Sequence, residues 1–438
     1  MRSYPEIGIQ VSDILLPTSQ VDPRKWAVIA CDQFTSQPEY WQKVQAKVGS
    51  SPSTLDLILP EVYLGTPEET RRIHSTQEAM RRYIGEKILE PIEGLIFIER
   101  EVDGKTRRGL MMALDLERYD FNKGSQSLIR ATEGTIIERL PPRIRIREGA
   151  PLEIPHILVL IDDPDRMVIE PLIEARSVLR PLYDFDLMLG SGHLRGYLVD
   201  DRSQENRIVD ALTWLASPQH FRLTYHVGED KGLLLFAVGD GNHSLATAKS
   251  IWEKLKPTVG PDHPARYALV EVENVHDQGL VFEPIHRIMF GVKSNWKKSM
   301  QDFFKGNVQF QPVTSIHNMI SAIHNQAGPE QIVGVLSEQG VELVSFENPP
   351  TNLAVGTLQA FLDNWMKVGG ASQIDYVHGD EVVSWLGQQT GNLGFYLPAL
   401  EKSSLFKTVI LDGSLPRKTF SMGEAHEKRF YMECRKIY

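Results

Sequence analysis

The stretch that decides the fold is 233–256, LLLFAVGDGNHSLATAKSIWEKLK. It starts with an apolar run typical of a buried strand, passes through the turn GDGNHS at 239–244, and continues with the spacing of an amphipathic helix. The backbone N–H groups in the first turn of such a helix point at one spot, and the helix dipole favours negative charge there. The turn therefore predicts an anion site, and phosphate is the natural guest.

The residues of this turn suggest individual roles. Gly239 and Gly241 let the backbone approach a ligand without a Cβ in the way, Asp240 offers a metal ligand, and His243 offers a proton donor. Ser244 is expected to cap the helix. The alternative interpretation is a plain tight turn followed by a capped helix. The spacing matches neither a Walker loop nor a dinucleotide fingerprint.

A second candidate segment is 128–149, LIRATEGTIIERLPPRIRIREG. Arg143, Arg145 and Arg147 alternate with isoleucines at the period of a strand, which predicts a strand with one basic face. Arginine suits phosphate or carboxylate, so Arg143 is a candidate ligand of the anion. Upstream, Arg130 and Glu133 are expected to act as a clamp and a proton acceptor. A solvated edge strand is the competing interpretation for the three alternating arginines.

Both ends of the chain carry further candidates. Asp32 follows the apolar run WAVIA, at a strand end where active-site groups often project, and it is a second candidate proton acceptor. Its neighbour Cys31 is expected to be a buried structural thiol. Near the C-terminus, the segment 415–437 concentrates charged and hydroxyl side chains around Gly423. We interpret this segment either as a phosphate-facing loop or as a polar tail.

Histidines in loop-like contexts raise the question of a metal centre: His193, His243, His286 and His378. Protein zinc sites usually include a close pair of ligands on one element, and none of these histidines has a second one nearby. Mg²⁺ accompanying a phosphate, with Asp240 as its ligand, is the favoured metal.

The remaining sequence predicts a mixed α/β fold with two domains, 1–290 as the core and 291–438 as a smaller α+β domain that returns C-terminal residues to the core. A β-hairpin is expected around Asp103-Gly104. Helices are expected at 66–89, with a Thr66/Glu69 capping box, and at 164–179, 204–215, 296–304, near 315 and at 353–366, together with a hairpin at 332–346.

Bulk composition narrows the function classes. The 438 residues carry a net charge of -10, which argues against general nucleic-acid binding. The two cysteines cannot build a disulfide framework, and neither a signal peptide nor a membrane span is apparent. We therefore expect a cytoplasmic protein without a membrane or nucleic-acid partner.

Several of these blocks together resemble the large prokaryotic family known as domain of unknown function 1015. They are CDQFTSQ, the Glu133 segment, VGDGNHSLATAK, FEPIHR and LPRKTFSMGEA, spread from 31 to 435. Most of the family has Asp-Gly-His-His-Arg at 240–244, a block similar to one that faces nucleotide phosphates in the fold shared by ParB, sulfiredoxin and the free-serine kinases. The resemblance thus implies a ParB/sulfiredoxin-like nucleotide-binding core with an additional α+β domain. The same resemblance implies that Asp240, Gly241 and His243 face the phosphate.

This sequence departs from that pattern at two positions. Asn242 replaces a histidine, and Ser244 replaces the arginine that would grip phosphate, which puts nucleotide binding and phosphoryl transfer in question. Family members also tend to lie beside serine-biosynthesis genes. This association implies serine or phosphoserine as a candidate substrate.

The leading hypothesis is a small-molecule kinase or related phosphotransferase that uses ATP or ADP, or another phosphorylated small molecule, with Mg²⁺. Asp32 or Glu133 would take the hydroxyl proton. The expected phosphate-binding residues are Gly239, Asp240, Gly241, Asn242, Ser244, Arg130 and Arg143. One alternative is a metal-assisted phosphatase using His193, His243 and His286. The other is a non-catalytic nucleotide-sensing or partner-binding protein.

Overall fold

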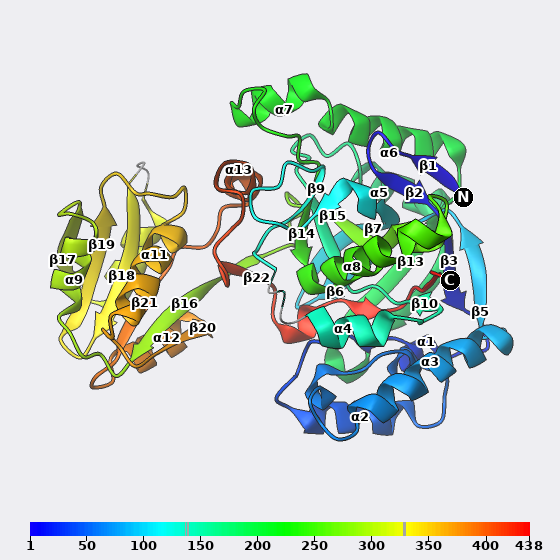
Figure 1. The fold of residues 1–438 in the computed structure, drawn as a ribbon, viewed down its shortest axis with the longest axis horizontal. Coiled ribbons are helices and arrows are strands. Elements are labelled where there is room, and N and C mark those ends of the chain that lie inside the picture. Colours follow the sequence, from blue (N-terminus) through cyan, green and yellow to red (C-terminus); the bar gives the residue numbers. More distant parts are fainter. Residues whose placement is uncertain (136, 138–139, 327–329) are drawn as a thin grey trace. The chain divides into compact units, whose positions relative to one another are not determined.

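A computed structural model describes residues 1–438 except 136, 138–139 and 327–329. It divides into two compact units, the first made of Met1–Val281 with Met422–Tyr438 and the second of Phe282–Ser421 (Figure 1). The division at 281/282 precedes the boundary expected near 290, which falls at the end of strand β16 (Phe282–Phe290). The mixed α/β class predicted from the sequence is confirmed.

The first unit is organised by one large mixed sheet with the strand order β12-β13-β6-β7-β15-β11-β14-β9-β8, extended by β2 and β1 beside β7. The strands of this sheet are β1 (Arg2–Tyr4), β2 (Ile9–Val11), β6 (Leu95–Val102), β7 (Lys105–Asp115), β8 (Tyr119–Asp120), β9 (Ile129–Ala131), β11 (Leu158–Ile161), β12 (Arg180–Asp186), β13 (His193–Val199), β14 (Phe236–Asp240) and β15 (Tyr267–Asn274). Three short ladders lie outside it: β3 (Asp13–Pro17) with β5 (Leu89–Glu93), β4 (Val28–Ile29) with β23 (Phe430–Tyr431), and β10 (Leu152–Glu153) with β24 (Arg435–Lys436).

Helices cover both faces of the large sheet, so its strands are buried on both sides. Along β6, Leu95 and Phe97 pack in one core, which also contains residues of α6 and α8, whereas Ile96 and Ile98 pack in the opposite core with residues of α1, α2 and α3. The helices of this unit are α1 (Pro23–Trp26), α2 (Pro38–Val48), α3 (Glu69–Gly85), α4 (Leu140–Arg147), α5 (Pro171–Ala175), α6 (Arg202–Leu215), α7 (Pro218–Tyr225) and α8 (Asn242–Val259). This arrangement fixes α8 across one face, with its first turn at the end of β14.

The predicted hairpin and strand-turn-helix are confirmed. Asp103 and Gly104 have φ values of 49° and 73°, as the tight turn between β6 and β7 requires. Two helix predictions need correction. The helix expected at 66–89 begins at Glu69, whose carboxylate accepts from the N–H of Gly65 (2.6 Å) in place of the expected capping box. The helix expected at 164–179 is reduced to α5 and a following 3-10 turn, Arg176–Val178.

The strand predicted for the alternating arginines is wrong. The segment forms helix α4, in which Pro141 and Pro142 lie in the first turn, where no backbone N–H is needed. Each arginine pairs with a different carboxylate: Arg143 with Glu61, Arg145 with Glu69, and Arg147 with Glu153. The alternation therefore reflects three ion pairs, not the pleat of a strand.

The second unit repeats the layered plan on a smaller scale. Its sheet has the order β17-β19-β18-β21-β16-β20, with β22 (Phe420–Met422) beside β16. The other strands are β17 (Val308–Val313), β18 (Gln331–Ser337), β19 (Gly340–Phe346), β20 (Gln373–His378) and β21 (Leu393–Tyr396), and the helices are α9 (Trp296–Phe303), α10 (Ile316–His324), α11 (Ala354–Lys367), α12 (Asp380–Gly387) and α13 (Lys402–Asp412). Neighbouring residues of β16 again face opposite cores, Met289 with α11 and Ile288 with α10.

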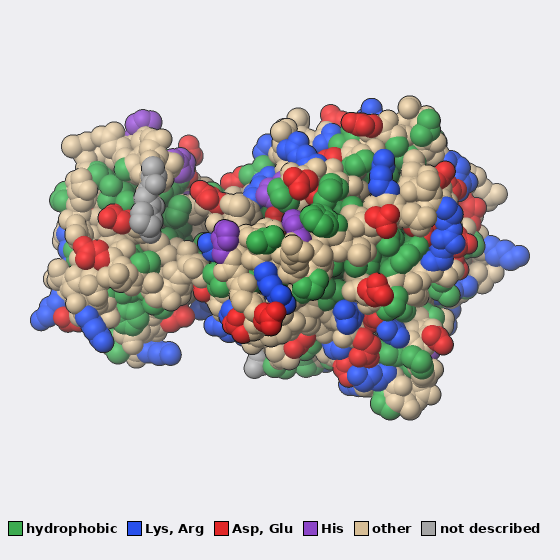
Figure 2. Space-filling model, turned by 90° about the horizontal axis from the view of Figure 1, so that it is seen from above, with side chains coloured by type: hydrophobic (Ala, Val, Ile, Leu, Met, Phe, Trp, Pro, Cys, Tyr) green, Lys and Arg blue, Asp and Glu red, His purple; other side chains and the backbone are tan. Residues whose placement is uncertain are grey.

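The surface carries charges of both signs. On the face shown in Figure 2, Lys and Arg side chains are interspersed with Asp and Glu side chains. Within the described residues, the helices are too short or too polar to span a bilayer.

Gly241 provides a test of the strand-turn-helix. Its φ is +79°, and a Cβ added there would lie 3.0 Å from the Cα of Ile157. We expect Gly241→Ala to lower the free energy of unfolding by about 1–2 kcal/mol through the left-handed backbone alone, and by more through this contact. Urea unfolding would measure the loss.

Gly124→Ala is the matched control, because Gly124 has the same φ of +79° and open space around its Cβ direction. A loss in Gly241→Ala no greater than in Gly124→Ala would show that the close approach to Ile157 is unimportant.

Candidate functional site

The end of β14 meets the start of β11, and this neighbourhood contains the candidate site. The two strands are antiparallel, with Leu158 opposite Asp240. His156 comes just before β11, so the antiparallel pairing brings it beside the turn that follows β14. Their contact is direct, because the Oγ of Ser244 lies 3.1 Å from Nε2 of His156.

The C-terminal segment completes the site. Strand β23 pairs with β4, with Phe430 opposite Ile29. This pairing brings Lys428 to Asp240, with 3.2 Å between Nζ and Oδ2. We call Asp32, His156, Asp240, Ser244 and Lys428 the Asp240 cluster.

His156 is the centre of this cluster. Its Nε2 faces Ser244 and, at 3.9 Å, the Oδ2 of Asp32, while Nδ1 lies 2.8 Å from the hydroxyl of Tyr431. The Tyr431 oxygen accepts from the N–H of Cys31 (3.1 Å), so its own O–H can donate to Nδ1 of His156. That tautomer places the ring proton on Nε2. Ser244 is then a hydrogen-bond partner of the imidazole and not a nucleophile activated by it.

The carboxylates around the cluster have different proton affinities. Burial raises the pKa of Asp240, but the charge of Lys428 and the charge that His156 has when its ring is protonated, with hydrogen bonds from Lys428 and the Gly241 N–H, outweigh burial and leave the pKa below its usual value. For Glu61, burial raises the pKa, the Arg143 guanidinium opposes the rise, and the Asp32 charge adds to it, so the net pKa is raised. An ionised acid and a more easily protonated acid therefore share one region, an arrangement suited to proton transfer.

Arg143 reaches the site through Glu61. Its guanidinium pairs with the Glu61 carboxylate, and the N–H of Glu61 donates to the carbonyl of Cys31 (2.8 Å). Glu61 is thus anchored beside Asp32. The same surroundings raise the pKa of the Cys31 thiol, chiefly by burial and then by the charges of Asp32 and Glu61. This agrees with the expected structural role of Cys31.

The two turn glycines serve packing and not ligand approach, which corrects the sequence interpretation. A Cβ at Gly239 would lie 2.6 Å from the Sδ of Met422, and one at Gly241 would meet Ile157. Protein atoms already occupy the space that the missing side chains leave. The left-handed backbone at Gly241 is a further reason for glycine there.

The helix cap also differs from the prediction. Gly241 is the N-cap of α8 and no side chain caps the helix through a hydrogen bond, while Ser244 lies within the first turn. Asn242 is half-buried, and its Oδ1 has no hydrogen-bond partner among the described residues. His243 is half-buried as well, and its carbonyl accepts from the hydroxyl of Thr247 (2.7 Å).

Arg130 does not act as a clamp for the site, which is a second correction. It is buried and donates to the carbonyls of Ser127 (2.8 Å) and Gly232 (2.5 Å), thereby holding the loop before β14. Burial lowers its pKa to about 10. Glu133 follows β9, which is parallel to β14, and its neighbour Thr132 donates to the carbonyl of Val238 (2.6 Å). Glu133 is thus placed at the sheet edge where β14 ends.

The histidine constellation is absent from the described part of the chain, where no three His, Cys, Asp or Glu side chains are grouped to hold a metal ion. His193 lies between two acids of β12, at 2.7 Å from Asp186 and 2.5 Å from Asp184. His286 is buried in the second unit and accepts from the N–H of Leu397 through Nδ1 (3.1 Å). His378 belongs to β20 of the same unit.

Sequence reasoning missed His156, Glu61 and Lys428. A polar signal existed for two of them, since His156 directly precedes the apolar run 157–161 and Lys428 belongs to the C-terminal segment already singled out. Nothing local marks Glu61, whose role depends on a partner 82 positions away.

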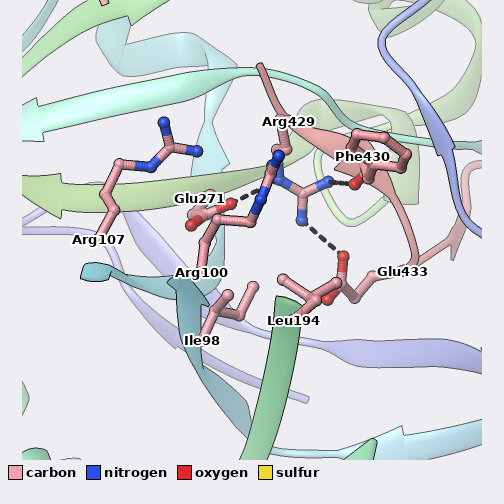
Figure 3. A pocket seen from close by; sticks show the side chains of 8 residues that line it. All are labelled: Ile98, Arg100, Arg107, Leu194, Glu271, Arg429, Phe430 and Glu433. Carbon is pink, nitrogen blue, oxygen red and sulfur yellow. Dashed lines mark hydrogen bonds and ion pairs between the residues drawn. The ribbon is translucent and has the colours of Figure 1, made fainter. Parts of the chain in front are cut away.

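A buried network of arginines holds the backbone next to the Asp240 cluster. Arg429 lies between Glu271 (2.7 Å) and Glu433 (2.5 Å) (Figure 3). It also donates to the carbonyl of Pro155 (2.5 Å), the residue before His156. Arg100 donates to the carbonyl of Lys428 (2.8 Å). The backbone that carries His156 and Lys428 is therefore held by fixed buried groups.

The Lys428–Asp240 pair leads to a prediction about stability. The pKa of Asp240 is held below its ordinary value of 3.8, so its ionised form stabilises the protein above that value, and the contribution is lost as the pH falls through the folded pKa. We expect Lys428→Met to lower the free energy of unfolding by about 1–3 kcal/mol at neutral pH. The deficit should shrink as the pH falls below 3.8 and through the lowered pKa of Asp240, where the carboxylate takes up a proton.

Denaturant unfolding at pH 7 and at a series of decreasing pH values below 3.8 would test this, with Lys436→Met as a control at an exposed lysine. A deficit that stays constant down to the lowest pH at which the protein folds would mean that the interaction with ionised Asp240 is not its source.

His286 gives a second pH prediction. Burial first, and then the charges of Arg287 and His378, lower its pKa from 6.5 to about 4. The unfolded chain therefore binds this proton more readily, and stability should fall as the pH drops from about 6.5 towards 4. His286→Gln should flatten this part of the stability profile, measured by urea unfolding of the full chain. An unchanged slope in the variant would exclude His286 as the titrating group.

Comparison with known proteins places the chain in a family. Among curated proteins none matches the sequence. Structures with a similar chain path include a conserved hypothetical protein from Pyrococcus furiosus (11% identity, TM-score 0.34, covering 75% of this chain and 95% of that one) and C-terminally truncated SbnI from Staphylococcus aureus (11%, 0.33, 74% and 82%). A free serine kinase variant in complex with AMP is a third (10%, 0.37, 75% and 91%).

The sequence comparison is more specific. The family model described as protein of unknown function DUF1015 matches residues 15–365, which include Asp32, His156 and the whole turn at 239–244. The chain therefore belongs to the DUF1015 family.

Proposed function

We propose that the Asp240 cluster binds the phosphate groups of a nucleotide or phosphorylated metabolite and transfers a phosphoryl group to a small hydroxyl compound. The observation that carries the proposal is the Asp240–Lys428 pair at the first turn of α8, a helix of 18 residues without a side-chain cap. Uncapped amides and a lysine are the groups that bind phosphate oxygens.

The donor set suits Mg²⁺ better than a transition metal. Asp240 would hold the ion, since Mg²⁺ is usually bound by one or two carboxylates together with substrate phosphates and water. The partnerless Oδ1 of Asn242 is a further oxygen acceptor at this turn. When bound, Mg²⁺ neutralises charge on the phosphate oxygens.

The protein's own residues account for the rest of the reaction. Lys428 and the first-turn amides of α8 hold the phosphate, and Lys428 supplies the positive charge that Ser244 does not. As the bond from phosphorus to the leaving phosphate oxygen breaks and a bond to the acceptor oxygen forms, the acceptor's proton passes to a carboxylate. Asp32 is the first candidate for that base, and Glu133, at the same sheet edge, is the second.

Serine is the first acceptor to test, because the genomic association noted for the family points to it. The pKa of Glu61 is raised beside Asp32, so Glu61 is suited to exchange a proton with Asp32. A non-catalytic, nucleotide-sensing function is the second candidate. It is favoured by Ser244, whose hydroxyl is engaged with His156, and by Arg143, which is already paired with Glu61.

A thermal-shift screen tests the binding step. We expect Mg²⁺ with ATP, ADP or pyrophosphate to stabilise the wild-type protein, by about 2.7 kcal/mol when the free ligand is at a hundredfold excess over Kd. Asp240→Asn should abolish most of this stabilisation, because it removes the carboxylate that would hold Mg²⁺. Asp165→Asn, at an exposed position, is the control.

A turnover assay with Mg²⁺, ATP and serine separates the two candidate functions. Formation of ADP and phosphoserine that is lost in Asp240→Asn and Asp32→Asn supports the phosphotransferase, whereas stabilisation without turnover supports the sensor. If none of the ligands stabilises the protein, the phosphate site is absent.

A further inference from the structure

A hollow lies in the first unit, between α2, α3 and the segment that joins them. Its volume is about 290 Å³, at the lower end of the range of small-molecule sites. Its wall includes Trp41 of α2, Tyr63, and three arginines of α3, Arg71, Arg72 and Arg82. The turn at 239–244 contributes nothing to this wall.

The hollow arises from the residues that α3 turns towards α2. Positions 72, 75, 76 and 79 follow one helical stripe, where a helix normally presents large apolar side chains to its neighbour. Here Ser75, Thr76 and Ala79 are small, and an arginine stands on either side of them. The sequence thus leaves space and lines it with cations.

The charge of this hollow is opposite to that of the whole chain. Arg71 and Arg72 share the Glu68 carboxylate at 3.4 and 2.8 Å, and Arg82 has no carboxylate partner among the described residues. The acid in the wall, Asp56, already accepts from the hydroxyl of Tyr83 (2.5 Å).

Trp41 contributes its ring to the wall of the hollow. Its indole N–H is buried and has no acceptor in the described part of the chain. A ligand that brings oxygen acceptors and negative charge would satisfy this wall.

One short segment connects the hollow to the surroundings of the Asp240 cluster. Pro60 and Tyr63 line the hollow, and Glu61 between them pairs with Arg143 and is anchored to Cys31. We propose that the hollow binds the anionic group, carboxylate or phosphate, of the small molecule on which the Asp240 cluster acts. The residues of the wall alone support the binding of an oxyanion. The role of the hollow as the acceptor site rests on the proposed function.

Isothermal titration of the full-length protein with inorganic phosphate, citrate, serine and phosphoserine tests the binding. We expect saturable binding of at least one of these probes, weakened about tenfold or more in Arg82→Gln, because a hydrogen bond to a charged group contributes about 1.5–3 kcal/mol. Arg81→Gln is the matched control. It removes the same charge from the adjacent position of α3, outside the wall.

A second variant keeps the charges and fills the space. Ser75 is exposed at the hollow, so Ser75→Phe should block binding while leaving the thermal unfolding of the protein unchanged. Binding of citrate and phosphoserine to one site in the wild type would indicate a general oxyanion site, whereas binding of serine alone would indicate a carboxylate site with a pocket for the amino group. Absence of binding by all four probes, or equal binding by wild type, Arg82→Gln and Ser75→Phe, overturns the proposal.

The experiments distinguish failure of the proposed oxyanion site from failure of the proposed function. Asp240→Asn should retain binding at the hollow, and Arg82→Gln should retain the stabilisation by Mg²⁺ and ATP. If the hollow binds a probe while ATP has no effect, the oxyanion site stands and the phosphotransferase does not.

Discussion

The buried ion pairs of Arg429 are the constraint on which the first unit depends. Arg429 is 4% exposed and lies between Glu271 of the central sheet and Glu433 of the same C-terminal segment. Removing one member of such a group leaves an uncompensated buried charge, at a cost of about 3–5 kcal/mol. Met422–Tyr438 returns to this core after the whole second unit, so a distant segment is fixed by a few groups that must be paired.

This constraint also explains why the site is built from segments far apart in the sequence. The β4–β23 ladder is only two residues long and would be weak alone. Buried side chains hold β23 in register. They are Arg429, Arg100 and Trp26, and the indole of Trp26 donates to the carbonyl of Met432 (2.9 Å). Lys428 is therefore positioned beside Asp240 by backbone that cannot relax easily, and this is the condition for a site that works by electrostatic preorganisation.

The sequence predicted what depends on local pattern and missed what depends on long-range pairing. The strand-turn-helix at 233–256 and the hairpin at Asp103-Gly104 follow from periodicity and turn chemistry, and both were correct. Helix α4 was mistaken for a strand because alternation over five residues does not distinguish a pleat from a helix whose arginines reach three separate acids. Within the site, Asp32, Asp240 and Ser244 were found in advance, whereas His156 and Lys428 acquire their roles only through β11–β14 and β4–β23 pairing.

Ser244 shows how one substitution can be absorbed by such a site. An arginine at this position would bring a cation to the first turn of α8, but the serine hydroxyl instead contacts Nε2 of His156. The positive charge near Asp240 then comes from Lys428, 188 positions away and just before β23, and its pairing with Asp240 lowers the pKa of that carboxyl. Under the proposed function, Asp240 would exchange this partner for a metal ion while Lys428 turns to phosphate, since both new pairs are charge-complementary. Lys428 would then contact the anion in place of the arginine that the family resemblance implies at position 244.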